Sequence, residues 1–290
     1  MANLRLIRRR VRSVRKTQQI TRAMKLVAAA KLKRAQEAAL RARPYAAKVG
    51  EVIASLAARA KPELSPLLQV REAVRRADLV VLTSDRGLCG AFNLNVFRRV
   101  EEFLKESRGR YEGSTLTLVG RKGRDYFRHK AGAYGAEIGK ELIRVAPDYP
   151  TAAALGEELV QRYLEGAADE LWLAFNEFRS VISQRPVIRK LLPITPMAVA
   201  EGTYLPDYLY EPSAGAILNE LLPRHLYLQL YQGLLESTAG ELGARMSAMD
   251  NATRNAGEMI ERLTLRMNKA RQEGITKELM DIVTGAEALK

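Results

Sequence analysis

The stretch from Leu221 to Lys290, LLPRHLYLQLYQGLLESTAGELGARMSAMDNATRNAGEMIERLTLRMNKARQEGITKELMDIVTGAEALK, decides the fold. It contains no proline after Pro223, and one row of apolar or small residues recurs every seven positions, at Leu221, Leu228, Leu235, Leu242, Met249, Ala256, Leu263 and Ala270. A second row lies four residues on, at Ala239, Met246, Thr253, Ile260 and Met267. Two such rows are typical of a coiled-coil seam. With the residues from Ala216, they predict a helix of about 70 residues, about 105 Å long at 1.5 Å per residue.

A second long helix is predicted at the other end of the chain, from about Leu4 to about Ala60. Its first apolar residues follow the 3-4-3 spacing of a coiled-coil seam, at Leu4, Ile7, Val11 and Val14. The stripe then becomes thinner, at Ile20, Met24, Val27, Ala28, Ala35, Ala38 and Ala42, and resumes at Val49, Ile53 and Leu56. Pro44 predicts a kink, because proline removes one helical hydrogen bond. The segment 61–66, which contains two prolines, predicts the end of this helix.

The two seams are expected to bury each other. Because the long helices lie at opposite ends of the chain with a domain between them, the simplest arrangement is an antiparallel pair within one molecule. The carboxy-terminal helix is the longer by ten residues or more. Part of it should therefore project beyond its partner or pack elsewhere.

The middle of the chain predicts a small α/β domain. Strand candidates are 78–83, 115–119, 170–178 and 187–194, and helical segments lie at about 93–107, 123–130 and 151–166. Strands that alternate with helices predict a mostly parallel sheet, here with a final hairpin. We therefore predict three regions: an amino-terminal coiled-coil helix at 1–61, a central domain at 76–195 and a carboxy-terminal coiled-coil helix at 212–290. Prolines at 193, 196, 206 and 212 mark the exit from the central domain.

The net excess of positive charge lies in the first predicted helix. The chain has a formal net charge of +14, but residues 1–61 hold 17 Lys and Arg and only two acids, a balance of +15, whereas the remainder balances at −1. This helix is expected to face an acidic partner. A basic coiled-coil arm that binds nucleic acid is one alternative, although no aromatic residue interrupts the basic run before Tyr45.

No catalytic, cofactor or metal site is predicted. The loop Thr83–Asn93, TSDRGLCGAFN, follows a strand and precedes a helix, where a phosphate loop would lie, but it matches neither nucleotide-binding glycine pattern. Cys89 is the only cysteine, and the two histidines, His129 and His225, have no acid placed to orient them for activating a thiol. Two histidines and one cysteine also make a transition-metal site improbable. A tight structural turn explains the loop better.

No membrane-spanning or secretory segment is predicted. No run of 18 apolar residues exists, and no continuous apolar segment follows the basic start. A mitochondrial transit peptide is disfavoured, because the same helical pattern continues far beyond any cleavage point.

Several long motifs resemble the gamma subunit of bacterial F-type ATP synthases. They are ITRAMKLVAAAK at 20–31, TSDRGLCG at 83–90, YLYEPS at 208–213, YQG at 231–233, NKARQ at 268–272 and ITKELMDIVTGAEA at 275–288. The matches lie at both ends and in the middle, so the resemblance spans essentially the whole chain.

The resemblance implies an antiparallel coiled coil of the two terminal helices with a Rossmann-like α/β domain at its foot. The coiled coil would stand inside a ring of three alpha and three beta subunits, and the foot would dock on the c-ring of the membrane sector and on the epsilon subunit. It implies a proton-driven rotor that is not itself catalytic, holds no cofactor, binds no nucleic acid and inserts no segment into the membrane. Its place would be peripheral, at the cytoplasmic face of the cell membrane.

The resemblance also implies contact residues. Arg245, Arg271 and Gln272 match positions that contact a beta subunit as a catch. Met24, Lys25 and Cys89 would face the acidic segment of the beta subunits, although the family often has Glu or Gln where this chain has Lys25. Contacts with the c-ring and epsilon are implied for Tyr204, Tyr208 and Tyr210.

Overall fold

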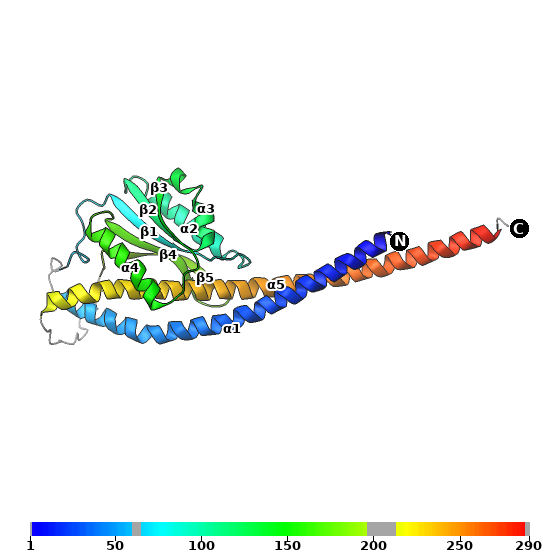
Figure 1. Cartoon of the computed structure of the whole chain (residues 1–290), viewed down its shortest axis with the longest axis horizontal. Helices are drawn as coiled ribbons and strands as arrows, with labels where there is room; N and C mark the ends of the chain where they lie inside the picture. The colour runs from blue at the N-terminus through cyan, green and yellow to red at the C-terminus, as the bar shows by residue number, and fades with distance from the viewer. Residues whose placement is uncertain (1, 60–64, 196–212, 288–290) are drawn as a thin grey trace. The chain divides into compact units, whose positions relative to one another are not determined.

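The computed structural model describes residues 2–59, 65–195 and 213–287 (Figure 1). Its contacts divide the chain into two units. The first consists of Met1–Ala29 with Arg245–Lys290, and the second of Ala30–Ala244.

Two long helices form the ends of the chain, as predicted. Helix α1 runs over Ala2–Arg59, 58 residues, and helix α5 runs over Ala214–Glu287, 74 residues. Pro44 lies inside α1 and Pro223 inside α5, so neither proline ends its helix. No helix in the described ranges combines the length and apolar composition needed to cross a membrane.

In the first unit the two helices pair antiparallel. The hydroxyl oxygens of Thr21 and Thr253 lie 2.7 Å apart, and Gln18 donates from Nε2 to the carbonyl of Thr253 at 3.4 Å. Lys25, further along α1, donates to Asp250, which lies earlier on α5, at 2.6 Å. As numbers rise on α1, their partners on α5 fall, which is the antiparallel order.

In the structure the seam of α1 keeps its 3-4 spacing through Ala28, whereas the predicted stripe departed from this spacing after Val14. In the first unit, the positions turned away from solvent are Leu4, Ile7, Val11, Val14, Gln18, Thr21, Lys25 and Ala28, each buried or half-buried. The prediction that Ile20 and Val27 belong to this stripe is wrong, because both side chains are more than half exposed. Thr21 and Ala28 hold the seam positions beside them. A polar residue is accepted there because its hydrogen-bonding groups find partners on α5.

The second unit contains the α/β sheet. Its strands are β1 (Arg76–Leu82), β2 (Gly113–Val119), β3 (Ala136–Leu142), β4 (Glu170–Phe178) and β5 (Gln184–Leu192), in the order β3-β2-β1-β4-β5. The first four are parallel, and β5 returns antiparallel to β4. This confirms the mostly parallel sheet with a final hairpin. The sequence prediction missed β3, an edge strand with alternating burial whose charged residues weaken the apolar signal.

Helices cover both faces of this sheet. They are α2 (Phe92–Glu106), α3 (Arg121–Phe127), the short 3-10 helix η2 (Ala131–Tyr134) and α4 (Tyr149–Leu164). Side chains alternate along each strand, so Leu79 and Val81 pack in one core with α2, while Val80 and Leu82 pack in the other with α4. The second core also takes Ile53 of α1 and residues 218–234 of α5, which fixes this part of both long helices to the sheet.

Glycines let α5 lie close to its neighbours in the second unit. A Cβ on Gly233 would stand 2.7 Å from the Cδ2 of Leu173 on β4, and one on Gly156 of α4 would stand 2.3 Å from the Cδ1 of Tyr227. Both distances are shorter than carbon atoms tolerate, so these positions require a residue without a side chain.

A buried carboxylate lies at the amino end of β4. Glu170 accepts hydrogen bonds from Lys190 at 2.7 Å, from Arg110 at 2.9 Å, and from the Tyr111 hydroxyl and the Trp172 indole. Burial raises the pKa of Glu170, but the hydrogen bonds from Lys190 and Tyr111 outweigh it, and the pKa lies below its ordinary value. These side chains come from three segments of the chain, so the cluster links β4, β5 and the segment before β2.

Candidate functional site

The loop after β1 is a rigid turn held by its own polar groups. Ser84 donates from Oγ to the carbonyl of Arg86 at 2.7 Å and receives a hydrogen bond from the Asn93 amide at 2.8 Å. Asn93 in turn accepts from the Ser84 backbone N–H at 3.0 Å. These bonds tie the loop to the first turn of α2 and occupy the polar groups of the Ser84 and Asn93 side chains.

Cys89 points into this turn. Its side chain is 2% exposed, and its sulfur lies 3.3 Å from the Asn93 amide nitrogen and 3.8 Å from the Ser84 hydroxyl. An amide and a hydroxyl do not activate a thiol as a histidine would. The geometry gives Cys89 a structural part in shaping the loop.

Leu88, which was not among the predicted site residues, is a large apolar residue that this turn exposes to solvent. Its φ is +64°, a conformation that leucine rarely adopts, and its side chain is 64% exposed. A backbone angle cannot be read from residue types alone, although the glycines on either side of the Leu88–Cys89 pair did indicate a tight turn.

Lys25 already has a partner in the first unit. Its ion pair with Asp250 is 2.6 Å long, and the hydrogen bond from Lys25 holds the pKa of Asp250 below its ordinary value. The neighbouring Met24 is half-buried, and Arg245 is half-buried on α5. The positive charge at position 25 is thus balanced within the chain, which the sequence analysis did not foresee.

The last part of α5 is bare. Every residue from Arg271 to Met280 is exposed, so Arg271 and Gln272 both lie on an open helix surface. Five apolar side chains of this end are 52–67% exposed: Ile275, Leu279, Met280, Ile282 and Val283. The expectation that α5 extends past its partner is met over these described residues.

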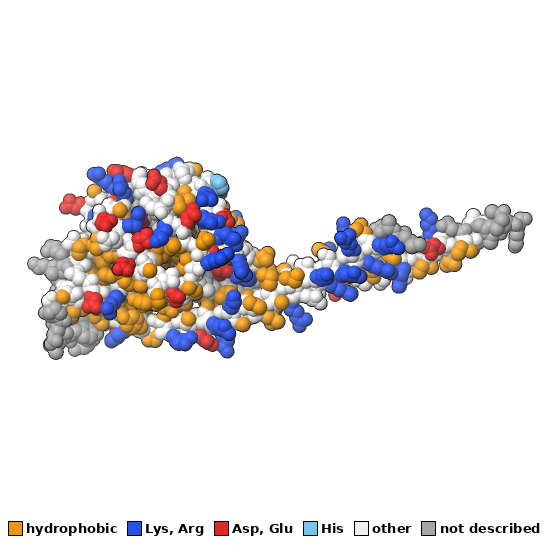
Figure 2. Space-filling view, in the orientation of Figure 1, with side chains coloured by type: hydrophobic (Ala, Val, Ile, Leu, Met, Phe, Trp, Pro, Cys, Tyr) orange, Lys and Arg blue, Asp and Glu red, His pale blue; other side chains and the backbone are white. Residues whose placement is uncertain are grey.

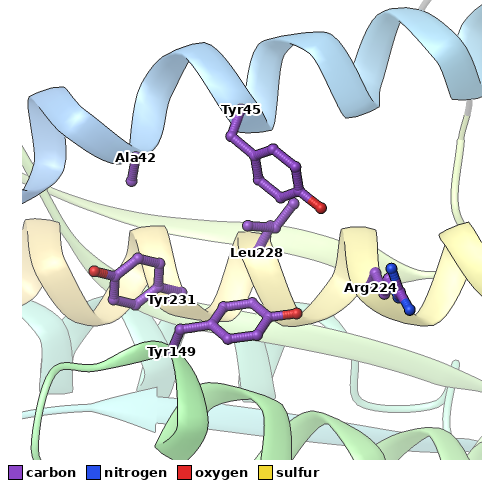
Figure 3. A pocket seen from close by; sticks show the side chains of 6 residues that line it. All are labelled: Ala42, Tyr45, Tyr149, Arg224, Leu228 and Tyr231. Carbon is purple, nitrogen blue, oxygen red and sulfur yellow. The ribbon is translucent and has the colours of Figure 1, made fainter.

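A shallow groove of about 550 Å³ lies in the second unit where α1, α4 and α5 approach one another (Figure 3). The rings of Tyr45, Tyr149 and Tyr231 line it with Ala42, Arg224 and Leu228, and the rings of Tyr149 and Tyr231 meet edge to face at 6.1 Å. Arg224 is bound to Glu220 at 2.6 Å. This groove could not be predicted from the sequence, because its lining comes from three separate segments.

The three tyrosines predicted to contact the c-ring and epsilon, Tyr204, Tyr208 and Tyr210, lie outside the described residues. Among the residues that the structure does describe, no group of three or more His, Cys, Asp or Glu side chains is placed to hold a metal ion.

Comparison with known proteins identifies the family. The ATP synthase family model matches residues 3–289. A curated protein of Geobacter metallireducens, "ATP synthase gamma chain", is 50% identical to this chain, and one of the same description from Anaeromyxobacter sp. strain Fw109-5 is 52% identical; each alignment covers all of both chains. The chain belongs to the ATP synthase gamma chain family. The comparisons give no support to the nucleic-acid-binding alternative.

Solved structures of ATP synthases contain chains with a similar fold. A chain of the Tetrahymena thermophila mitochondrial ATP synthase central stalk and c-ring is 25% identical, with a TM-score of 0.59, over 80% of this chain and 99% of that one. A chain of the Euglena gracilis mitochondrial ATP synthase in rotational state 3 has a TM-score of 0.70 at 21% identity, over 99% and 95% of the two chains. The second likeness concerns the fold alone, and it confirms paired terminal helices with a Rossmann-like domain.

Proposed function

We propose that this gamma chain is the central rotor shaft of a bacterial F-type ATP synthase. It turns inside a ring of alpha and beta subunits, docks on the c-ring and epsilon with its foot, and works at the cytoplasmic face of the cell membrane as a peripheral subunit. The observation that carries this proposal is the bare end of α5, where apolar side chains are exposed to water and none of the described residues covers them. Such a surface is completed by a surrounding partner.

An asymmetric shaft gives chemically identical sites different properties. One chain inside a threefold ring touches each catalytic site with a different face. A contact shifts a conformational equilibrium only by its different affinity for the two states, so rotation would change the nucleotide affinity of each site in turn. The shaft itself needs stiffness, which the paired seams supply, and no catalytic group.

The stator contacts are proposed on two surfaces. On the coiled coil they comprise Met24, Lys25 and Arg245, and on the bare end of α5 they comprise Arg271 and Gln272. Arg271 supports this role because guanidinium groups bind carboxylates in a bidentate manner, and its side chain is exposed on an open helix face. Cys89 supports a contact indirectly, since its buried thiol shapes the loop that presents Leu88. Tyr204, Tyr208 and Tyr210 are proposed to meet the c-ring and epsilon.

The test of the proposed function is reconstitution. The alpha-beta ring is assembled with and without this chain, and steady ATP hydrolysis is measured. We expect turnover to depend on the chain, and equal turnover without it would contradict the proposal. In the same assay, Arg271→Ala with Gln272→Ala should weaken the link between nucleotide occupancy and shaft angle, whereas Arg262→Ala, an exposed arginine on the same helix, serves as the control.

A further inference from the structure

The face that α1 buries in the first unit contains polar side chains, although larger apolar ones lie beside them. Thr21 is 8% exposed, and Gln18 and Lys25 are half-buried. Ile20 and Val27 are instead 59% and 56% exposed, and they share a face because seven residues make almost two helical turns. That face lies about 100° from Thr21 around the helix, which is the rotation of one residue. Burial of apolar area alone would therefore favour turning α1 by one residue.

Hydrogen bonds to α5 explain why the polar face is the buried one. The hydroxyl oxygens of Thr21 and Thr253 lie 2.7 Å apart, and Thr253 also donates to the carbonyl of Met249 at 2.7 Å. Because a hydroxyl has one proton and that of Thr253 is used on Met249, Thr21 is the donor between the two helices. Gln18 donates from Nε2 to the carbonyl of Thr253 at 3.4 Å. Two side chains of α1 thus bind one residue of α5.

Gly257 leaves room for the contact of Gln18 with α5. A Cβ at position 257 would stand 3.2 Å from the Nε2 of Gln18, which is a tight contact. Gly257 lies one helical turn beyond Thr253, so the two residues are neighbours on the same face of α5. The missing side chain therefore opens the path by which Gln18 reaches the Thr253 carbonyl. Glycine inside a helix is less stable than alanine, and this contact gives the position a structural reason.

The hydroxyl that partners Thr21 is not repeated at the neighbouring seam positions of α5. Seven residues before and after Thr253 lie Met246 and Ile260, and neither side chain has a hydroxyl. In another register Thr21 and Gln18 would face apolar side chains, and a buried polar group that loses its hydrogen-bond partner destabilises the fold. A polar residue within an apolar seam specifies the register of coiled coils in this way.

The same hydrogen bonds decide which side chains α1 exposes. With Thr21 turned toward α5, Ile20 and Val27 lie on the outer surface of the helix pair. Figure 2 shows Lys and Arg side chains along this pair with hydrophobic side chains among them. Met24 lies between the two faces and is half-buried. A rotation of α1 by one residue would bury the exposed apolar side chains and change the surface that this part of the helix offers to a partner.

We propose that Gln18, Thr21 and Thr253 form a polar layer that fixes the register of the coiled coil and holds Ile20 and Val27 on its outer face. The three polar side chains are positioning residues, because they act by orienting the other side chains of α1. That the outer face meets a ring subunit rests on the proposed function. The register itself is a property of the chain alone and is tested without the ring.

Spin labels measure the register in the full chain. They are attached to Ala23→Cys on α1 and Asn251→Cys on α5, two exposed positions, in a Cys89→Ser background, and the distance between them is measured by pulsed electron paramagnetic resonance. We expect one narrow distance when the polar layer is intact.

The decisive variant replaces the layer by apolar side chains of similar size. Gln18→Leu with Thr21→Val and Thr253→Val removes donors and acceptors together, so the chain should still fold. We expect a second distance between the labels in about a tenth or more of the molecules. One narrow distance, unchanged from the parent, would overturn the proposal, because the apolar seam alone would then fix the register.

Matched controls separate the register from general effects of substitution. Thr264→Val removes a hydroxyl that donates to the carbonyl of Ile260 in its own helix at 2.7 Å, and it should leave a single distance. Thr21→Ser with Thr253→Ser keeps both hydroxyls and should also leave a single distance, and a second distance in either control would overturn the proposal. Where the apolar triple variant does not fold, Thr21→Val alone takes its place with the same two outcomes. A ring that hydrolyses ATP equally well without the chain would contradict the proposed function and leave this measurement unaffected.

Discussion

The sheet-bearing unit and the end of α5 treat apolar side chains in opposite ways. In the sheet, Leu79, Val80 and Leu173 are completely buried, and the buried carboxylate of Glu170 at the start of β4 is paired with Lys190 and Arg110. On α5 beyond Arg271, Ile275, Leu279 and Ile282 stand in water. The first region buries its apolar side chains within the chain, whereas the second leaves them exposed, as expected of a surface that a partner would cover. Stability and function can therefore be separated by mutation.

The largest effect on stability is expected in the sheet. Leu173→Ala removes a fully buried side chain that touches α5, and it should lower the free energy of unfolding by about 3–4 kcal/mol through lost burial and a residual cavity. Leu279→Ala on the bare helix end is the matched control and should change it by less than about 0.5 kcal/mol. Equal losses, measured by urea unfolding of the isolated chain, would mean that the end of α5 is covered after all.

Removing the charge of the buried carboxylate Glu170 should also lower the free energy of unfolding, by a smaller amount that depends on pH. Glu170→Gln leaves Lys190 and Arg110 without their counter-charge and should cost about 3 kcal/mol at pH 7. Because the folded pKa of Glu170 is lowered, its contribution is present above the unfolded value of about 4.5 and is lost as the pH falls through the folded pKa. The difference in unfolding free energy between the parent and the variant should therefore be large at pH 7 and smaller at pH 3. A constant difference at both pH values would contradict this account, and Glu157→Gln on the exposed face of α4 is the control.

The close contact between Gly156 of α4 and Tyr227 of α5 leaves no space for a side chain at position 156, so a substitution there should destabilise the chain. Gly156→Ala places a Cβ 2.3 Å from the Tyr227 ring and should destabilise the chain by about 2 kcal/mol, because ring and helix must move apart. The double variant Gly156→Ala with Tyr227→Leu, which removes the ring, should recover part of the loss. Gly132→Ala, where a Cβ would meet open space, should have little effect in the same thermal melts.

The smallest effect is expected at the exposed ion pair of the coiled coil. Asp250→Asn should change stability only slightly, since exposed pairs gain little over solvation. Combined with Lys25→Gln, it should show a coupling energy of the same small size in a double-mutant cycle at low salt, which 1 M salt removes. A coupling that persists in 1 M salt would contradict this assignment, because it would mean that the pair is shielded from water.

Much of the architecture could be predicted because it depends on repeated patterns. The heptad rows of α5 and the apolar runs that became β1, β2 and β4 are signals spread over many residues, and they outweigh local exceptions. At α1 two apolar residues, Ile20 and Val27, shifted the predicted stripe to the wrong face. The seam there is formed instead by the polar residues Gln18, Thr21 and Lys25. The edge strand β3 was missed for a related reason, since its charged residues resemble a loop.

The contact surfaces were less accessible from the sequence. The exposure of Leu88 depends on a positive φ, and the Lys25–Asp250 pair depends on two residues 225 positions apart meeting across a helix pair. The bare end of α5 was partly foreseen, because its length exceeds that of α1. Which of its side chains bind a partner depends on the surface of that partner, which this chain does not encode.

The most direct measurement is to watch the shaft turn. A bead fixed to this chain in an immobilised alpha-beta ring should rotate in one direction during ATP hydrolysis, with three equally spaced pauses per turn, since one asymmetric chain meets three equivalent sites. Steady hydrolysis with a motionless bead would contradict the account.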